Sequence, residues 1–150
     1  MQLTRAADYG LRVVIHMAGL PQGTIVRLKT LAQVVEVPES FLAKVLQTLT
    51  RGGLMLSRRG PEGGFELPAS SREATILDVL TVVDGPVQLN ACLGENGECP
   101  RKERCVAHPI WAEAQIAMLT VLSRDSIGEL AEKAAQQDRR TESSVQSVAV

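Results

Sequence analysis

Two short helical patterns followed at once by a glycine-rich extended segment constrain the fold of this chain more than any other feature. Apolar residues repeat at helical spacing from Leu28 to Val35, and the pattern ends before Pro38 because the residue preceding a proline avoids α-helical geometry. A second pattern runs from Leu42 to Leu49 and is followed by Gly52, a residue type on which helices commonly end. These patterns predict a helix-turn-helix over residues 28–51.

The segment after the second helix changes from helical to extended character. Leu54–Ser57 and Phe65–Leu67 are short extended pieces that flank Arg58–Gly64, a turn rich in glycine and proline. This pattern predicts a β-hairpin wing over residues 54–67. The expected fold class is therefore mainly α, with a winged helix-turn-helix.

Charge is distributed unevenly along the chain. Residues 1–72 hold nine basic and five acidic residues, a net charge of +4, whereas the other 78 hold seven basic and twelve acidic, a net of −5. The stretch Ser40–Pro61 contains four basic residues and no acidic one. Each feature alone is typical of a solvated helix or turn, but their order and shared charge favour major-groove reading by the helix and phosphate contact by the wing. The candidate contacts to double-stranded DNA are Ser40, Lys44, Gln47, Arg51, Arg58 and Arg59.

Composition and motifs argue against other classes of function. The chain has only four aromatic residues, too few for proteins that stack single-stranded bases on aromatic platforms. It shows no Walker-type phosphate loop, nucleophile elbow or paired-histidine metal motif, so we do not expect an enzyme. Neither a secretion signal nor a membrane span is evident, which predicts a cytoplasmic protein with reduced thiols.

The chain after residue 86 predicts a cysteine-bearing loop, a long apolar helix, a short last helix and a tail. A cysteine-bearing loop at 86–108 precedes a helix at 109–123 that is apolar on most of its circumference. A helix of this kind needs two neighbours, so we expect it to pair with its copy in a homodimer. Capping boxes are predicted at Thr75 with Asp78 and at Ser126 with Glu129. The last helix is expected to end near residue 135, with a disordered tail at 136–150.

The cysteine loop is the second cluster of chemically informative residues. Its pattern is Cys92-x6-Cys99-x5-Cys105-x2-His108. Thiolates with a neighbouring imidazole suit an iron-sulfur cluster or zinc, and the spacing differs from that of paired zinc knuckles. Free or redox-active thiols are the alternative for the cysteines. His108 is either a ligand or a cap of the following helix, which begins at Pro109.

Three motifs together resemble one bacterial family. They are the opening at residues 1–12, the wing turn at Arg59–Phe65 and the three-cysteine loop. In order and spacing they are similar to the Rrf-two family of transcription regulators, over residues 1–132. The resemblance implies a dimeric winged-helix protein whose iron-sulfur cluster alters DNA binding, with Cys92, Cys99 and Cys105 as cluster ligands and the long helix forming the dimer.

The resemblance leaves the fourth ligand open. His108, followed by Trp111, is similar to the 2Fe-2S site of the IscR type, whereas Asp8 of the partner subunit stands where nitric oxide sensors of the NsrR type hold a 4Fe-4S cluster. Ala43 and Lys44 differ from the recognition helix of the IscR type, so no operator sequence is implied. We expect a repressor that senses cluster status, redox state or nitric oxide. The alternative is a zinc- or thiol-based redox-responsive winged-helix module that binds a protein and holds no cluster.

Overall fold

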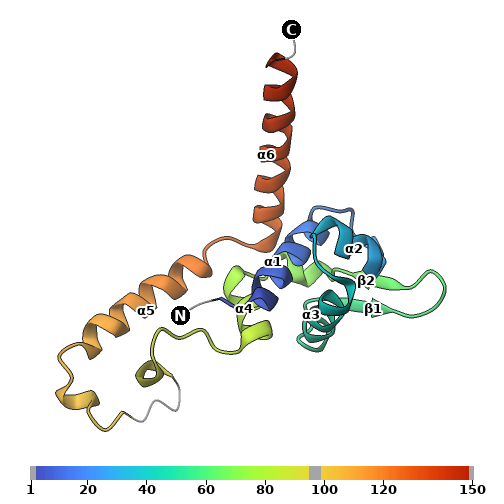
Figure 1. Ribbon diagram of the computed structural model, residues 1–150. Coiled ribbons are helices and arrows are strands. Elements are labelled where there is room, and N and C mark those ends of the chain that lie inside the picture. The colour runs from blue at the N-terminus through green and yellow to red at the C-terminus, as the bar shows by residue number, and fades with distance from the viewer. Residues whose placement is uncertain (1–2, 95–98, 149–150) are drawn as a thin grey trace.

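The computed structural model describes the backbone of residues 3–94 and 99–148 and the side chains of residues 3–94 and 99–140. These residues form a mainly helical fold with one two-stranded sheet (Figure 1). In chain order the elements are α1 (Arg5–Ala18), α2 (Leu28–Val34), α3 (Glu39–Arg51), β1 (Leu56–Arg58), β2 (Gly64–Glu66), η1 (Ala69–Arg72), α4 (Ile76–Asp84), η2 (Ala91–Leu93), η3 (Lys102–Arg104), α5 (His108–Leu122) and α6 (Ile127–Val148).

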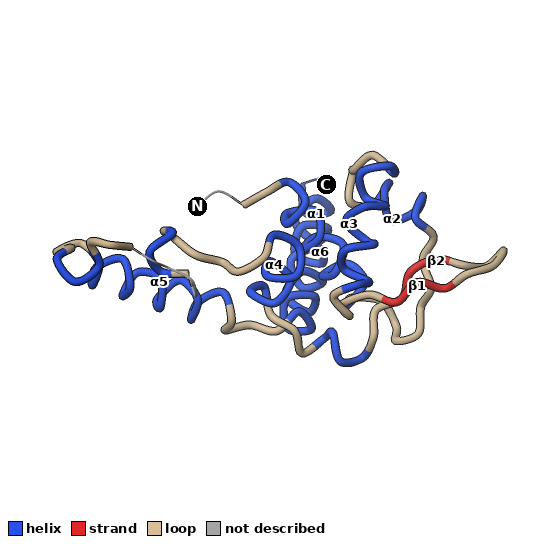
Figure 2. The backbone as a smooth tube through the Cα atoms, turned by 90° about the horizontal axis from the view of Figure 1, so that it is seen from below, coloured by secondary structure: helices blue, strands red, loops and turns tan. Residues whose placement is uncertain are grey.

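The molecule has two regions with different packing. We call residues 3–85 and 126–135 the body and residues 86–94 and 99–122 the arm. The body contains α1 to α4, the hairpin and the first turns of α6, while the arm consists of the cysteine loop and α5. In both views the arm and the hairpin project from opposite sides of the body (Figures 1 and 2).

The core of the body lies where α1, α3 and α4 meet. The inward face of α3 is fully buried at Leu42, Leu46 and Leu49, which are spaced as one side of an amphipathic helix. A Cβ atom on Gly52, at the end of α3, would overlap the side chain of Val82 in α4. The missing side chain therefore permits the close approach of these two elements.

The hairpin is attached to the rest of the body by backbone hydrogen bonds. Ser57 faces Phe65 in the antiparallel register of β1 and β2. Phe65 also exchanges two backbone hydrogen bonds with Val26, at 2.8 and 2.9 Å, so the loop before α2 adds a short third edge to the sheet. The wing is thus connected directly to the chain segment that leads into the helix-turn-helix.

The body and the arm meet where two capping boxes lie side by side. Thr75 caps α4 reciprocally with Asp78, and Ser126 caps α6 with Glu129, as the sequence predicts. Thr75 and Ser126 also form a β-bridge, and the backbone N–H of Ile127 donates to the carbonyl of Ala74 at 2.7 Å. These contacts place the start of α6 directly against the start of α4.

The C-terminal segment differs from its prediction. The sequence predicts a helix that ends near residue 135 and a disordered tail at 136–150, but α6 continues to Val148. Ile127 and Ala131 bury its first turns against α1, and the remaining turns project from the body (Figure 1). The segment after 135 lacks an apolar stripe, so apolar periodicity gives no sign of the continued helix. Residues 149–150 lie outside the described residues.

The helix of the arm has no buried residue among its fifteen. Ile110 and Ile116 are 68% and 67% exposed, values that are high for isoleucine in a folded domain. A hydrogen bond from the backbone N–H of Leu89 to Oε1 of Gln115, at 3.0 Å, connects the loop to the helix. The predicted helix at 109–123 is thus present, with most of its apolar surface uncovered in the single chain.

Among the helices that the structure describes, none combines the length and the apolar character that a membrane span requires.

Candidate DNA-binding surface and cysteine loop

One side of α3 is polar and exposed along its whole length. Ser40, Lys44, Gln47 and Arg51 are all exposed, opposite the buried leucines of the same helix. Their side chains are short or flexible hydrogen-bonding groups with two cations, the types that reach base edges and phosphates. The structure thus brings the four predicted α3 residues together on one accessible face.

The turn before α3 contains an unusual backbone conformation. Glu36 has a φ of 56°, in the left-handed region that residues other than glycine enter at a cost. The next residue, Val37, is buried, and its N–H donates to the carbonyl of Ala32 at 2.9 Å. The buried contact of Val37 therefore holds the turn, and with it the angle between α2 and α3.

The two arginines predicted in the wing have different surroundings. Arg58 donates from Nε to Oε2 of Glu66 at 2.8 Å, across the hairpin, and its Nη2 lies equally close to the same oxygen. Arg59 is exposed in the turn and forms no ion pair within the described part of the chain. Of the two, Arg59 is therefore the cation that is free to meet a phosphate, while Arg58 also stabilises the hairpin.

A third arginine near the wing was missed by the sequence analysis. Nη2 of Arg27 lies 3.2 Å from Oε2 of Glu62 and 3.3 Å from the carbonyl of Pro61. Arg27 directly precedes α2, so this pair connects the tip of the wing to the start of the helix-turn-helix. The two residues are 35 positions apart, and no local pattern links them in the sequence.

The three cysteines all lie in the arm. Cys92 is in η2, Cys99 precedes η3 and Cys105 follows it, and all three are half-buried free thiols. Within residues 3–94 and 99–140, no three His, Cys, Asp or Glu side chains are close enough together to hold a metal ion. The thiols are thus near one another along the chain but do not converge on one point.

His108 lies at the start of α5, next to the cysteine loop. Its backbone N–H donates to the carbonyl of Cys105 at 3.1 Å, and the helix has no side-chain cap in the described chain. Its Nε2 atom is buried and has no hydrogen-bond partner among the described residues. A buried nitrogen without a partner is costly, and a metal ion is one group that would satisfy it. The donors around this loop, thiolate sulfur and imidazole nitrogen, are chemically suited to an iron-sulfur cluster.

Asp8, the other candidate ligand, lies in α1 and therefore in the body. Its carboxylate is 2.8 Å from Nη2 of Arg12, whose guanidinium also lies over the ring of Tyr9, 5.8 Å from its centre. Tyr9 meets Phe41 of α3 edge to face, with ring centres 5.6 Å apart. Figure 1 shows η3 at the far end of α5 and η2 alongside that helix, both away from α1, so the described part of one chain does not bring Asp8 to the cysteines.

Comparison with known proteins decides the family. The sequence model named Rrf2, described as an iron-dependent transcriptional regulator, matches residues 3–133 of this chain. The chain belongs to the Rrf2 family. The resemblance stated from the sequence motifs is thereby confirmed, and the chain is a transcriptional regulator of this family.

Individual Rrf2 relatives agree with this assignment. A protein of Mycobacterium tuberculosis named as an HTH-type transcriptional regulator is 31% identical over 132 residues, which cover 87% of this chain and 81% of the relative. The HTH-type transcriptional regulator IscR of Vibrio campbellii is 29% identical over 130 residues, covering 87% of this chain and 77% of IscR. These relatives are regulators, in agreement with the expectation that this Rrf2 protein is not an enzyme.

A solved structure confirms the predicted fold class. CymR, described as the global cysteine regulator of B. subtilis, superposes with a TM-score of 0.71 at 26% identity, covering 89% of this chain and 98% of CymR. The mainly helical winged fold is therefore that of an Rrf2 regulator.

Proposed function

We propose that this Rrf2 protein is a cytoplasmic homodimeric repressor that binds operator DNA through α3 and the wing and senses an iron-sulfur cluster held by its cysteine loop. The observation that supports the cluster most directly is the combination of three free, half-buried thiols with the buried, unpartnered Nε2 of His108. Loss or change of the cluster would report cellular iron-sulfur status, redox state or nitric oxide.

The proposed DNA surface consists of the exposed side of α3 and the turn of the wing. Ser40, Lys44 and Gln47 lie in the N-terminal half of α3, the part of a recognition helix that reads base edges. Arg51, Arg58 and Arg59 would then neutralise phosphates of the DNA backbone. Arg58 would do so while keeping part of its ion pair with Glu66.

The proposed dimer is formed by α5. Its exposed isoleucines, together with Trp111 and Val121, which are 43% and 59% exposed, give the helix apolar surface that the body leaves uncovered. A second copy of the same helix covers such a surface in a twofold arrangement. Dimerisation would also supply Asp8 of the partner subunit, which one chain does not bring to its own cysteines.

The cluster would be held by Cys92, Cys99 and Cys105, with His108 or Asp8 of the partner subunit as fourth ligand. When bound, an iron-sulfur cluster supplies reversible electron transfer and sensitivity to oxidants. The chain's own part is to gather three thiolates that do not converge in the described structure, which orders the loop of the arm. Because the arm joins the body at the bridge between Thr75 and Ser126, this ordering would bias the position of the reading helices, and DNA would in turn affect cluster stability.

One experiment tests the sensor. The protein is purified anaerobically, and its absorption spectrum and its iron, sulfide and zinc contents are measured for the wild type and for Cys92→Ala, Cys99→Ala and Cys105→Ala. Loss of visible absorbance in each variant is expected, and normal spectra in all three would exclude the ligand assignment. Two irons with loss in His108→Ala favour a 2Fe-2S cluster, and four irons with loss in Asp8→Ala favour a 4Fe-4S cluster.

The same measurement decides the alternative, a zinc- or thiol-based winged-helix module that binds a protein. The free thiols and the absence of a convergent donor set among the described residues favour this alternative. Zinc without iron, or neither metal in a protein that still responds to thiol oxidants, would replace the cluster by this mechanism.

A second experiment tests the DNA surface. Lys44→Ala and Arg59→Ala should each weaken binding to a duplex that the wild type selects from a random pool, by about tenfold, and a lost phosphate contact should lower the salt slope by about 1. Lys133→Ala, which removes an exposed cation on α6, is the matched control and should change neither value. Unchanged affinity and salt slope in both test variants would remove Lys44 and Arg59 from the interface.

A further inference from the structure

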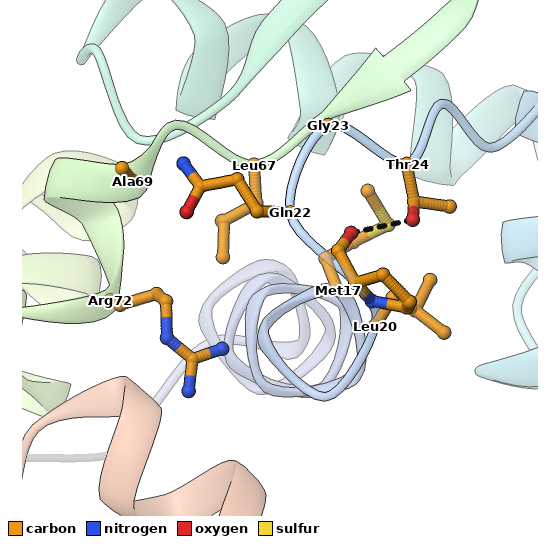
Figure 3. A pocket seen from close by; sticks show the side chains of 9 residues that line it. Met17, Leu20, Gln22, Gly23, Thr24, Leu67, Ala69 and Arg72 are labelled. Atoms are coloured by element: carbon orange, nitrogen blue, oxygen red, sulfur yellow. Dashed lines mark hydrogen bonds between the residues drawn. The ribbon is translucent and has the colours of Figure 1, made fainter.

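A cavity on the body lies apart from both the DNA surface and the cysteine loop. It has a volume of about 230 Å³ and is enclosed by the end of α1, the loop at residues 20–24, Leu67 after the wing, and η1. Figure 3 shows Ala69 and Arg72 on one side of this space, Met17 and Leu20 on the other, and the side chain of Gln22 between them. The proposed sensor mechanism gives this cavity no role.

The lining combines apolar walls with one cation. Met17, Leu20 and Leu67 present apolar side chains, and of the described residues that line the cavity only Arg72 is charged. Nη1 of Arg72 donates to the carbonyl of Ala18 at the end of α1. Its nearest carboxylate, that of Glu132, is 3.9 Å away, beyond hydrogen-bond distance, and 71% exposed.

This arrangement leaves the arginine with unused donors. A guanidinium has five N–H groups in a planar fork that matches a carboxylate. The bond to Ala18 engages Nη1, while Nε and Nη2 lie beside Gly128 and toward Glu132 of α6 without a hydrogen bond among the described residues. A partly enclosed cation beside apolar walls fits an anion with a short hydrocarbon chain. The volume fits as well, since a cavity of about 150 Å³ accommodates benzene.

We propose that this cavity binds a small carboxylic acid of about four to six carbons, with the carboxylate on Arg72 and the aliphatic chain against Met17, Leu20 and Leu67. The Gln22 side chain supplies a further donor at the same space. The ligand class is a monocarboxylate, such as an aliphatic or 2-oxo acid.

The cavity is connected to the wing by its own lining. Thr24 lies two residues before Val26, which exchanges backbone hydrogen bonds with Phe65, and Leu67 directly follows β2. A ligand that fixes the loop at 20–24 and Leu67 therefore restricts the wing at two points. One is the segment that is hydrogen-bonded to Phe65, and the other is the chain that leaves β2. On the basis of the proposed DNA-binding function, the acid acts as an effector of DNA affinity, and DNA must change the affinity for the acid by the same factor.

The site is tested with butyrate against butyramide, its neutral isostere, in ¹H–¹⁵N spectra of the full-length protein at constant ionic strength. Butyrate should shift the amides of residues 20–24 and 67–72, and butyramide should bind at least about tenfold more weakly because it lacks the charge. Arg72→Gln should abolish the preference. Because that variant also loses the bond to Ala18, Ala69→Leu, which enlarges a lining side chain at the exposed side of the cavity and keeps the arginine, is the second variant and should abolish binding of both probes. Equal shifts from both probes, or unchanged butyrate binding in Ala69→Leu, would overturn the site.

The coupling is tested separately with the selected duplex. Saturating butyrate should change the duplex Kd at least twofold in the wild type and leave that of Ala69→Leu unchanged. An unchanged Kd in the wild type would overturn the effector role. If the protein bound no duplex at all, the DNA-binding proposal would fail while the butyrate titration still decided the site.

Discussion

The body and the arm follow opposite rules of packing. The body buries whole helix faces, and its central leucines have no exposed surface. The arm holds a fifteen-residue helix on which no residue is buried, although several of its side chains are as apolar as those of the core. The difference teaches that the body is stable by its own contacts, whereas the arm leaves apolar surface uncovered in the single chain, the surface that the proposed dimer would cover.

The largest effect is expected from a cavity in the body. Leu46→Ala removes a fully buried side chain and should lower the free energy of unfolding by about 2–5 kcal/mol. Chemical denaturation followed by circular dichroism measures this value. Ile116→Ala in the arm is the matched control, and at a concentration where the protein is monomeric it should change the free energy of unfolding by less than about 0.5 kcal/mol.

The next effect is on association through the arm. Ile116 is 67% exposed in the single chain, so its apolar surface would be buried only when the dimer forms. Ile116→Ala removes part of that buried surface and should raise the dimer dissociation constant by about 10–100-fold. Sedimentation at several protein concentrations gives the constant. A dimer as tight as the wild type would show that α5 does not form the interface.

A smaller effect tests how closely the body is packed. Gly52→Ala places a methyl group on Val82 and should destabilise the fold by about 1–3 kcal/mol. Val82→Ala in the same chain should restore part of the loss, because it removes the overlapping atoms. Gly53→Ala, with a φ of 77° but open space around its Cβ position, should cost only about 1 kcal/mol.

The smallest effect is the pH dependence of stability, which differs between the body and the segment at residues 123–129 that joins the arm to α6. We call this segment the junction. Burial lowers the pKa of His16 in α1, so its contribution to stability is lost as pH falls from about 6.5 to its lower folded pKa. At the junction, Lys133 and then Arg124 lower the pKa of Asp125, and the Ser126 N–H and hydroxyl lower that of Glu129. These two contributions are present above about pH 4 and are lost below it.

Variants distinguish the two pH ranges. His16→Gln should flatten the decline of melting temperature between the ordinary and lowered histidine pKa and leave the acid decline unchanged. Glu129→Gln should flatten only the decline below the ordinary range of a carboxyl group. One variant that removed both declines would contradict the assignment of the two declines to separate groups.

Local chemistry explains which parts of the structure are predictable. Capping at Thr75 and Ser126, the face of α3 and the hairpin all depend on residues close together in the sequence, and each is found where the pattern predicts it. The ion pairs of Arg27 with Glu62 and of Arg58 with Glu66 depend on tertiary contact or strand register, so arginines that look equally free in the sequence have different surroundings. The cavity beside Arg72 joins segments some fifty residues apart and has no sequence signal.

The cysteine loop shows the other limit of the sequence. The spacing of the cysteines indicates which side chains can share a metal, but it does not determine their positions in space. In the described structure the three thiols do not come together. The burial of Nε2 of His108 is the information that only the structure supplies. The helical continuation of α6 to Val148 likewise has no apolar stripe that would predict it.

The position of Trp111 gives the two regions separate spectroscopic reporters. It is the single tryptophan of the chain and lies in the first turn of α5, whereas the single tyrosine, Tyr9, lies in α1. Indole emission therefore reports on the arm alone, in unlabelled protein. Its wavelength would move to the blue when a second helix excludes water from the ring, and its intensity would fall when a chromophore is bound nearby. Assembly and sensing can thus be followed in real time from one native residue.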